Sequence, residues 1–168
     1  MRKFAYELVE GLSYLHANGI LFCDLKPSNV LLNEYGVLKF ADFGLSKKLS
    51  DFTNPQQQQQ EQEAGRPKAG TPYYMAPELF HDSGVHSFFS DFWSLGCVLY
   101  ELAVGKPPFS SNSLKDLITM IVDGEAPLPV EGASAEFNDL LRRLLEKDPT
   151  KRMGWDDVRS HAFWLPGQ

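Results

Sequence analysis

The sequence predicts an α+β fold that is mostly helical and has a few short strands. Apolar residues recur at helical spacing within residues 2–18 and again over the last third of the chain. Three short apolar segments lie between residues 20 and 40, next to turn residues. With 168 residues, the chain is long enough to form one domain with a buried core.

The N-terminal elements follow from these patterns. A helix over residues 2–18 places four apolar side chains on one face, and Gly19 supplies its C-terminal stop. Residues 20–22 are a short strand candidate. Segments 30–32 and 38–40 flank the sequence NEYG, which predicts a hairpin. The four side chains on the helix face are Phe4, Leu8, Leu12 and Leu15.

The remaining elements begin with a change of composition. Residues 45–70 contain NPQQQQQEQEAGRPKAG, a polar tract with little to bury, so we expect a mobile loop there. Residues 91–103 are apolar almost all round, which indicates a helix buried at the centre of the domain. Amphipathic helices are expected near 113–123, 134–146 and 155–161, the first with capping-box spacing between Ser113 and Asp116.

Composition and charge exclude several classes of protein. Hydrophobic residues make up 43% and charged residues 23%, which is typical of a soluble globular domain. The net charge of -6 argues against a general nucleic-acid binder, because such proteins need a basic surface. Cys23 and Cys97 fit neither a metal site nor a disulfide framework. We find no signal peptide or membrane segment, so we expect a cytoplasmic protein without membrane insertion.

Three polar side chains lie between the segments 20–22 and 30–32: Asp24, Lys26 and Asn29. Taken alone, Asp24 would most often be a turn or capping residue. Together with Asp42 in ADFGLS, however, the set fits phosphoryl transfer. That reaction needs a carboxylate to accept the proton of the attacking hydroxyl, a cation near the phosphoryl group, and oxygen ligands for magnesium. The hairpin between Asn29 and Asp42 would bring the two magnesium ligands together.

Longer motifs point to a family. CDLKPSN resembles the catalytic loop of eukaryotic protein kinases, DFG their magnesium motif, and APE the end of their activation segment. DFWSLG and KDPTKRMGWDDV resemble the start of the central helix and the late segment that carries the arginine pairing with the glutamate of APE. The order of these motifs is similar to the C-terminal lobe of protein kinases, and Lys26 with GTPYYMAPE resembles the serine/threonine branch, not the tyrosine branch. Finer detail, such as FCDLKPSNVLL and HAFW, resembles the Fused/RUNKEL branch, related to the autophagy-initiating kinases.

The resemblance implies roles for the polar residues. Asp24 would be the catalytic base and Lys26 would contact the phosphoryl group of ATP. Thr71 would link the substrate-binding segment to both of them. Asn29 and Asp42 would bind Mg²⁺ and, through it, the nucleotide. The resemblance implies ATP and protein substrates as partners, with a regulatory protein as a further candidate partner and the cytoskeleton as a candidate location; nucleic acid is not expected.

The resemblance also implies supporting roles. Asp91 would hold the backbone of the catalytic loop, and Glu78 would pair with Arg152. Phe22 and Phe43 would stack in the spine that aligns two lobes. Three apolar residues would form the floor of the adenine site, with Leu31 under the ring. The alternative interpretation of these three and Thr71, as plain core residues, is the less favoured one. The other two floor residues are Val98 and Leu102.

The chain departs from the family pattern in three ways. No glycine-rich loop or strand lysine precedes the catalytic loop (22–29), so we expect the N-terminal lobe to be missing and these residues alone to be inactive. Phe22-Cys23 replaces the usual His-Arg pair. A glutamine-rich insertion (54–63) lengthens the activation segment (42–78). The leading hypothesis is a serine/threonine protein kinase domain; the alternatives are a pseudokinase scaffold or interaction module, and the translation of a partial gene.

Overall fold

A computed structural model describes residues 1–50, 72–81 and 84–165. Within these residues the fold is mostly helical with a few short strands, as the sequence predicts. The glutamine-rich insertion (54–63), Thr71 and most of the loop expected over 45–70 lie outside the described residues.

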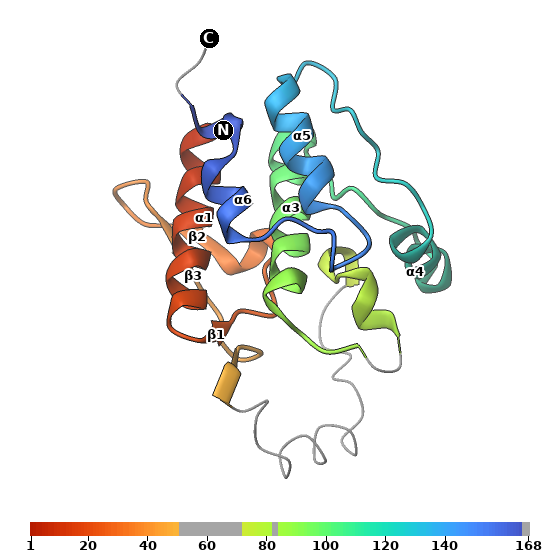
Figure 1. Ribbon diagram of the computed structural model, residues 1–168, viewed down its shortest axis with the longest axis horizontal. Helices are drawn as coiled ribbons and strands as arrows, with labels where there is room; N and C mark the ends of the chain where they lie inside the picture. The colour runs from red at the N-terminus through yellow and green to blue at the C-terminus, as the bar shows by residue number, and fades with distance from the viewer. Residues whose placement is uncertain (51–71, 82–83, 166–168) are drawn as a thin grey trace.

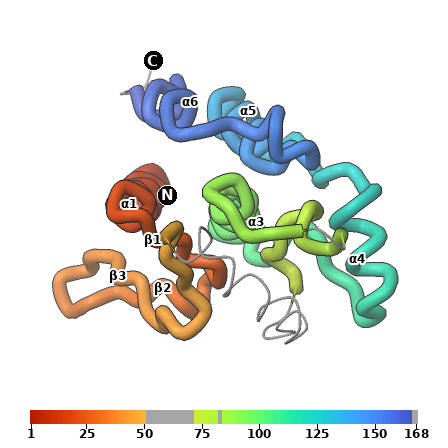
Figure 2. The backbone as a smooth tube through the Cα atoms, turned by 60° about the horizontal axis from the view of Figure 1, so that its bottom comes forward, coloured from red at the N-terminus to blue at the C-terminus, as the bar shows by residue number. Residues whose placement is uncertain are grey.

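The helices form layers (Figures 1 and 2). Helices α1 (Arg2–Ala17) and α3 (Phe88–Val104) lie in the middle. Helices α5 (Ala135–Leu144) and α6 (Trp155–Ser160) cover one side of this pair, and the strands lie on the other side. Helix α4 (Leu114–Val122) lies at the edge, beyond α3. The main core therefore sits between α1, α3 and α5.

Helix α1 follows its apolar pattern closely. Leu8, Leu12 and Leu15 are buried, and Phe4 is half-buried. The helix ends at Ala17, and Gly19 adopts the left-handed conformation with φ +68°. This conformation strains residues that have a Cβ, so glycine suits the position. The predicted stop is confirmed.

The strands form two short antiparallel pairs. Strand β2 (Val30–Leu32) pairs with β3 (Leu38–Phe40), which confirms the predicted hairpin. In its turn, the Asn33 side chain accepts hydrogen bonds from two backbone N–H groups. Strand β1 (Ile20–Leu21) pairs with β4 (Lys47–Lys48). Strand β4 was not predicted, because it lies at the start of the segment that we interpreted as loop.

Helix α3 is buried on nearly all sides, since every residue from 90 to 100 is buried. This confirms the predicted central helix, although it begins three residues earlier than expected. Ser87 caps it: its side chain accepts a hydrogen bond from the N–H of Phe89, and Ser90 Oγ accepts one from the N–H of Ser87. At Gly96 an added Cβ would lie 2.9 Å from Leu144 Cβ, so glycine lets α3 pack closely against α5.

The three later helices lie close to their predicted positions. Ser113 caps α4 by accepting a hydrogen bond from the N–H of Asp116, and Ser134 caps α5 in the same way through Phe137. A short 3₁₀ helix, η4 (Pro77–Phe80), packs against α4 and forms a second, smaller core with Trp93 and Phe109. None of the described helices has the length and apolar character needed to cross a membrane.

Candidate active site

The loop between β1 and β2 gathers three polar side chains. Asp24 Oδ2 lies 2.9 Å from Lys26 Nζ and accepts a hydrogen bond of 2.8 Å from Asn29 Nδ2. Asn29 Nδ2 also donates to the carbonyl oxygen of Asp24 at 2.9 Å, which fixes its amide. Asn29 itself is buried in the 3₁₀ helix η1 (Pro27–Asn29). Two side chains therefore hold the Asp24 carboxylate through Oδ2.

Asp91 holds this loop from beneath, as expected. Its two carboxylate oxygens accept hydrogen bonds of 2.9 Å from the backbone N–H groups of Phe22 and Cys23. Cys23 has φ +66°, a left-handed conformation that costs free energy for a residue with a side chain. Hydrogen bonds to a buried carboxylate are stronger than neutral ones, and they offset this cost. The strained residue lies directly before Asp24 and helps to set its direction.

Asp42 follows β3 in a second strained conformation, with φ +60°. Its Oδ1 accepts a hydrogen bond of 3.1 Å from the N–H of Gly44. The next residue, Phe43, packs edge-to-face on Phe22 with ring centroids 5.3 Å apart, which agrees with the expected stack. Backbone strain at functional sites is common, and here it marks the two predicted polar segments.

Asn29 and Asp42 are suited to hold magnesium together. The N–H of Ala41 donates to the carbonyl oxygen of Asn29 at 2.9 Å, so the hairpin joins the two segments. The Asn29 amide nitrogen faces Asp24, which leaves its oxygen as a possible ligand, and Asp42 is exposed. No group of three or more His, Cys, Asp and Glu side chains suited to a metal is found among the described residues. One amide and one carboxylate would suit a Mg²⁺ ion that takes its other ligands from phosphate and water.

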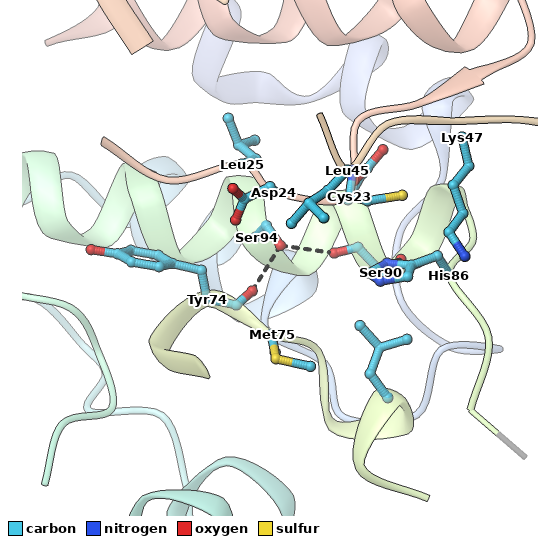
Figure 3. Close-up of a pocket in the computed structure, with 12 residues that line it drawn as sticks. Cys23, Asp24, Leu25, Leu45, Lys47, Tyr74, Met75, His86, Ser90 and Ser94 are labelled. Carbon is cyan, nitrogen blue, oxygen red and sulfur yellow. Dashed lines mark hydrogen bonds between the residues drawn. The ribbon is translucent and has the colours of Figure 1, made fainter. Parts of the chain in front are cut away.

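A pocket opens beside Asp24 (Figure 3). It encloses about 660 Å³, including the solvent at its mouth, and Cys23, Asp24, Tyr74 and Met75 are among its lining residues. Ser94 Oγ donates to the carbonyl oxygen of Tyr74 at 2.7 Å, which ties the segment after the insertion to α3. The pocket therefore lies between the catalytic loop and the segment that leads to APE.

The Tyr74 hydroxyl is also fixed. It donates a hydrogen bond of 2.6 Å to Glu101 Oε2 on α3. Burial and this hydrogen bond raise the pKa of Tyr74 above its ordinary value, so the hydroxyl stays protonated. One wall of the pocket is thus held to α3 at both the backbone and the side chain of Tyr74.

The predicted pair of Glu78 and Arg152 is confirmed. Arg152 donates from Nη1 and Nη2 to the two carboxylate oxygens of Glu78, at 2.8 and 2.9 Å. The Arg152 side chain is completely buried, and its remaining donors reach three backbone carbonyl oxygens. This bidentate contact anchors η4, the end of the predicted activation segment, to the C-terminal part of the chain.

The other predicted residues are distributed as follows. Leu31 on β2 and Leu102 on α3 are about half exposed, whereas Val98 is buried in the main core. Their predicted role beneath an adenine ring stays a prediction. Thr71 lies outside the described residues, so its predicted link to Asp24 and Lys26 also stays a prediction.

Sequence reasoning missed one group of residues. His16 lies at the end of α1, is buried, and contacts both Asp91 and Trp155. In the sequence, the signal that could have found it was a histidine in the last turn of an amphipathic helix, next to the apolar residue Leu15. Its partners lie 75 and 139 residues away, so the pattern of α1 could not reveal them.

Comparison with known proteins decides the family. Residues 1–164 match the protein kinase domain. The chain belongs to this family. It is 51% identical to serine/threonine-protein kinase RUNKEL of Arabidopsis thaliana over 95% of its own length and 11% of the relative. It is 39% identical to serine/threonine-protein kinase ULK4 of Mus musculus, over 98% of this chain and 14% of that protein. The predicted resemblance to serine/threonine kinases and to RUNKEL is confirmed.

A third relative gives the same result. Serine/threonine-protein kinase TIO of Arabidopsis thaliana is 40% identical over 97% of this chain and 12% of the relative. The chain thus spans between 11% and 14% of the length of these three relatives. Family membership follows from these matches, whereas activity, substrates and partners need a separate argument.

Proposed function

We propose that this kinase domain transfers the γ-phosphoryl group of ATP to serine or threonine hydroxyls of protein substrates. The arrangement of Asp24, Lys26 and Asn29 carries the proposal. The Asp24 carboxylate, a lysine 2.9 Å from it and an amide that donates to it form a set that phosphoryl transfer needs. A purely structural turn has no need of the lysine and the strained residue Cys23 together.

Each side chain has a distinct task in this proposal. Asp24, which lines the pocket, accepts the proton of the substrate hydroxyl and makes the hydroxyl oxygen a better nucleophile. Lys26 places a positive charge where negative charge develops on the transferred group. Asn29 keeps the Asp24 carboxylate in one orientation by donating to its second oxygen. Tyr74 and Met75 form the opposite wall, where the substrate backbone would lie.

Asn29 and Asp42 would hold Mg²⁺, and the ion would neutralise charge on the phosphate oxygens when it is bound. Leu31 would lie beneath the adenine ring. The 168 residues contain no glycine-rich loop or strand lysine before Asp24. We propose that they form the C-terminal lobe, and that the groups that cover the nucleotide from above come from a segment outside this sequence.

A scaffold without catalytic activity is the second candidate. Cys23 favours it, because this position in the family pattern carries an arginine and a thiol cannot bind a phosphate in the same way. The complete set of Asp24, Lys26, Asn29 and Asp42 favours catalysis.

The test uses a two-lobe chimera, in which the chain is joined to the N-terminal lobe of an active serine/threonine kinase. Asp24→Asn keeps the shape and the hydrogen bonds to Asn29 but cannot accept the substrate proton. We expect turnover of a peptide substrate to fall by about 10²–10⁴-fold. Turnover is measured as phosphate transfer from labelled ATP.

Asp116→Asn is the matched control, because it makes the same change on an exposed residue of α4. It should leave turnover unchanged. Equal turnover for the unaltered chimera and the Asp24→Asn variant would show that Asp24 is not the base. An unaltered chimera that folds and binds ATP but transfers no phosphate would support the scaffold instead.

A further inference from the structure

A buried chain of hydrogen bonds runs from the last helix to the catalytic loop. Trp155 Nε1, on α6, donates to His16 Nδ1 on α1 at 3.1 Å. His16 Nε2 lies 2.8 Å from Asp91 Oδ2 on α3. Asp91 in turn accepts the backbone N–H groups of Phe22 and Cys23. Each step joins a different part of the chain, and the last one lies next to Asp24.

The indole and the Asp91 carboxylate require the same tautomer of His16. An indole N–H can only donate, so His16 Nδ1 must be an acceptor and carries no proton. The ring proton of the neutral imidazole is therefore on Nε2, where it donates to Asp91. With this tautomer the indole N–H, both imidazole nitrogens and the Asp91 carboxylate all have hydrogen-bond partners. The other tautomer would place a lone pair of Nε2 against the carboxylate and a proton against the indole N–H.

The position of the Asp91 carboxylate depends on this proton. The side chains of His16 and Asp91 are each only 2% exposed, so water cannot replace a lost hydrogen bond. Asp91 Oδ2 is shared between His16 and the N–H of Phe22, while Oδ1 holds the N–H of Cys23. Repulsion between Nε2 and Oδ2 would move the carboxylate away from both backbone groups. Cys23, with its strained φ, would then lose the contact that holds it.

The indole is held rigidly enough to act in this way. The Trp155 ring packs edge-to-face on Phe92, with centroids 4.7 Å apart. The Arg159 guanidinium also lies over the Trp155 ring, 5.4 Å from its centroid. Arg159 is itself held, because it donates a hydrogen bond to Ser13 on α1. The half-buried indole therefore has a fixed orientation relative to α1 and α3.

We propose that Trp155 is a positioning residue for phosphoryl transfer. Its N–H occupies His16 Nδ1 and so, together with the Asp91 carboxylate at Nε2, fixes both the tautomer and the orientation of the ring; His16 and Asp91 pass this constraint to Phe22 and Cys23 and so to the direction of Asp24. Only the kinetic part of this proposal rests on the proposed function. The tautomer and the order of the loop can be measured in the 168-residue chain without any catalytic activity.

The experiment compares Trp155→Phe with Trp164→Phe. Both changes keep an aromatic ring and remove one indole N–H, but Trp164 donates to the carbonyl oxygen of Val158 and not to His16. We expect ¹⁵N NMR of the imidazole to show one fixed tautomer in the unaltered chain and in Trp164→Phe. In Trp155→Phe the Nδ1 signal should shift, because Nδ1 has lost its hydrogen-bond donor, and hydrogen exchange at the amides of Phe22 and Cys23 should rise about tenfold.

Kinetics in the two-lobe chimera give the second readout. Trp155→Phe should lower kcat about tenfold and leave the KM for ATP unchanged, because the change affects the direction of Asp24 and not the nucleotide site. If the unaltered chimera is inactive, the proposed function fails, while the NMR result still decides the role of Trp155 in loop order.

Two results would overturn the proposal. One is an unchanged Nδ1 signal and unchanged amide exchange in a folded Trp155→Phe variant; the other is an equal effect of Trp164→Phe. A third measurement needs no variant: the ¹⁵N–¹⁵N coupling across the hydrogen bond from Trp155 Nε1 to His16 Nδ1 should be detectable in the unaltered chain. Its absence would also count against the proposal if Trp155→Phe does not fold.

Discussion

At the scale of single residues, Asp91 contributes more than its formal charge suggests. Its carboxylate accepts two backbone N–H groups and faces His16 in a site closed to water. In Asp91→Asn an amide NH₂ would face at least one of these donors. We expect the free energy of unfolding to fall by about 3 kcal/mol, since a charge-assisted hydrogen bond is lost and a buried donor is left unpaired. Urea denaturation measures this loss.

The exposed Asp116→Asn change again serves as the control, with an expected effect within about 0.5 kcal/mol. A loss of less than about 1 kcal/mol in Asp91→Asn would mean that the loop keeps its hydrogen bonds by another route.

Residues close together in the sequence could be predicted as a group, and distant ones could not. Asp24, Lys26 and Asn29 lie within six positions, so a short loop between two strands must hold them near one another. Phe22 and Phe43 were paired only through the family resemblance. The contact of His16 with Trp155 spans 139 positions and depends on how α6 packs on α1, which no local pattern records.

At the scale of secondary structure, periodic apolar patterns predicted the long elements well. Helices α1, α4, α5 and α6 begin and end within about two residues of their predicted limits, because serine caps and Gly19 mark several of the ends. Strand β4 was missed because two residues carry no periodicity, and its pairing with β1 depends on a partner far away in the sequence. The start of α3 was placed late because its first turn was not recognised as helical.

The contact between η4 and the C-terminal segment gives a prediction about stability. Arg152→Ala removes a buried guanidinium that makes hydrogen bonds to Glu78 and to three backbone carbonyl oxygens. Removing one partner of a buried pair costs about 3–5 kcal/mol, because the other charge is left without compensation. We expect the melting temperature to fall by about 10 °C for a domain of this size.

Arg142→Ala is the matched control. Arg142 pairs with Asp139 on the surface of α5 and is largely exposed, and such pairs contribute less than about 1 kcal/mol. Calorimetry of both variants should separate them clearly. Similar melting temperatures for Arg152→Ala and Arg142→Ala would refute a stabilising role for the pair with Glu78.

At the scale of the whole molecule, the layers leave one side of the strands open. The hairpin lies on the side of α1 and α3 opposite to α5 and α6 (Figure 2), and four apolar side chains on it or just after it are between 39% and 56% exposed. Exposed apolar side chains that lie on one hairpin and directly after it are typical of a binding site. The proposed position of a second lobe would cover it. The four residues are Leu31, Leu32, Val37 and Phe43.

This surface predicts how the chain behaves in solution. The 168-residue chain should bind a hydrophobic fluorescent dye, and the double change Leu31→Ser with Leu32→Ser should lower the fluorescence by about half. Leu114→Ser with Met120→Ser removes two exposed apolar side chains from α4 and should have a small effect, because these residues lie on a different part of the molecule. The two-lobe chimera should also bind little dye. Strong dye binding by the chimera, or equal losses from both double variants, would show that the second lobe does not pack against the hairpin.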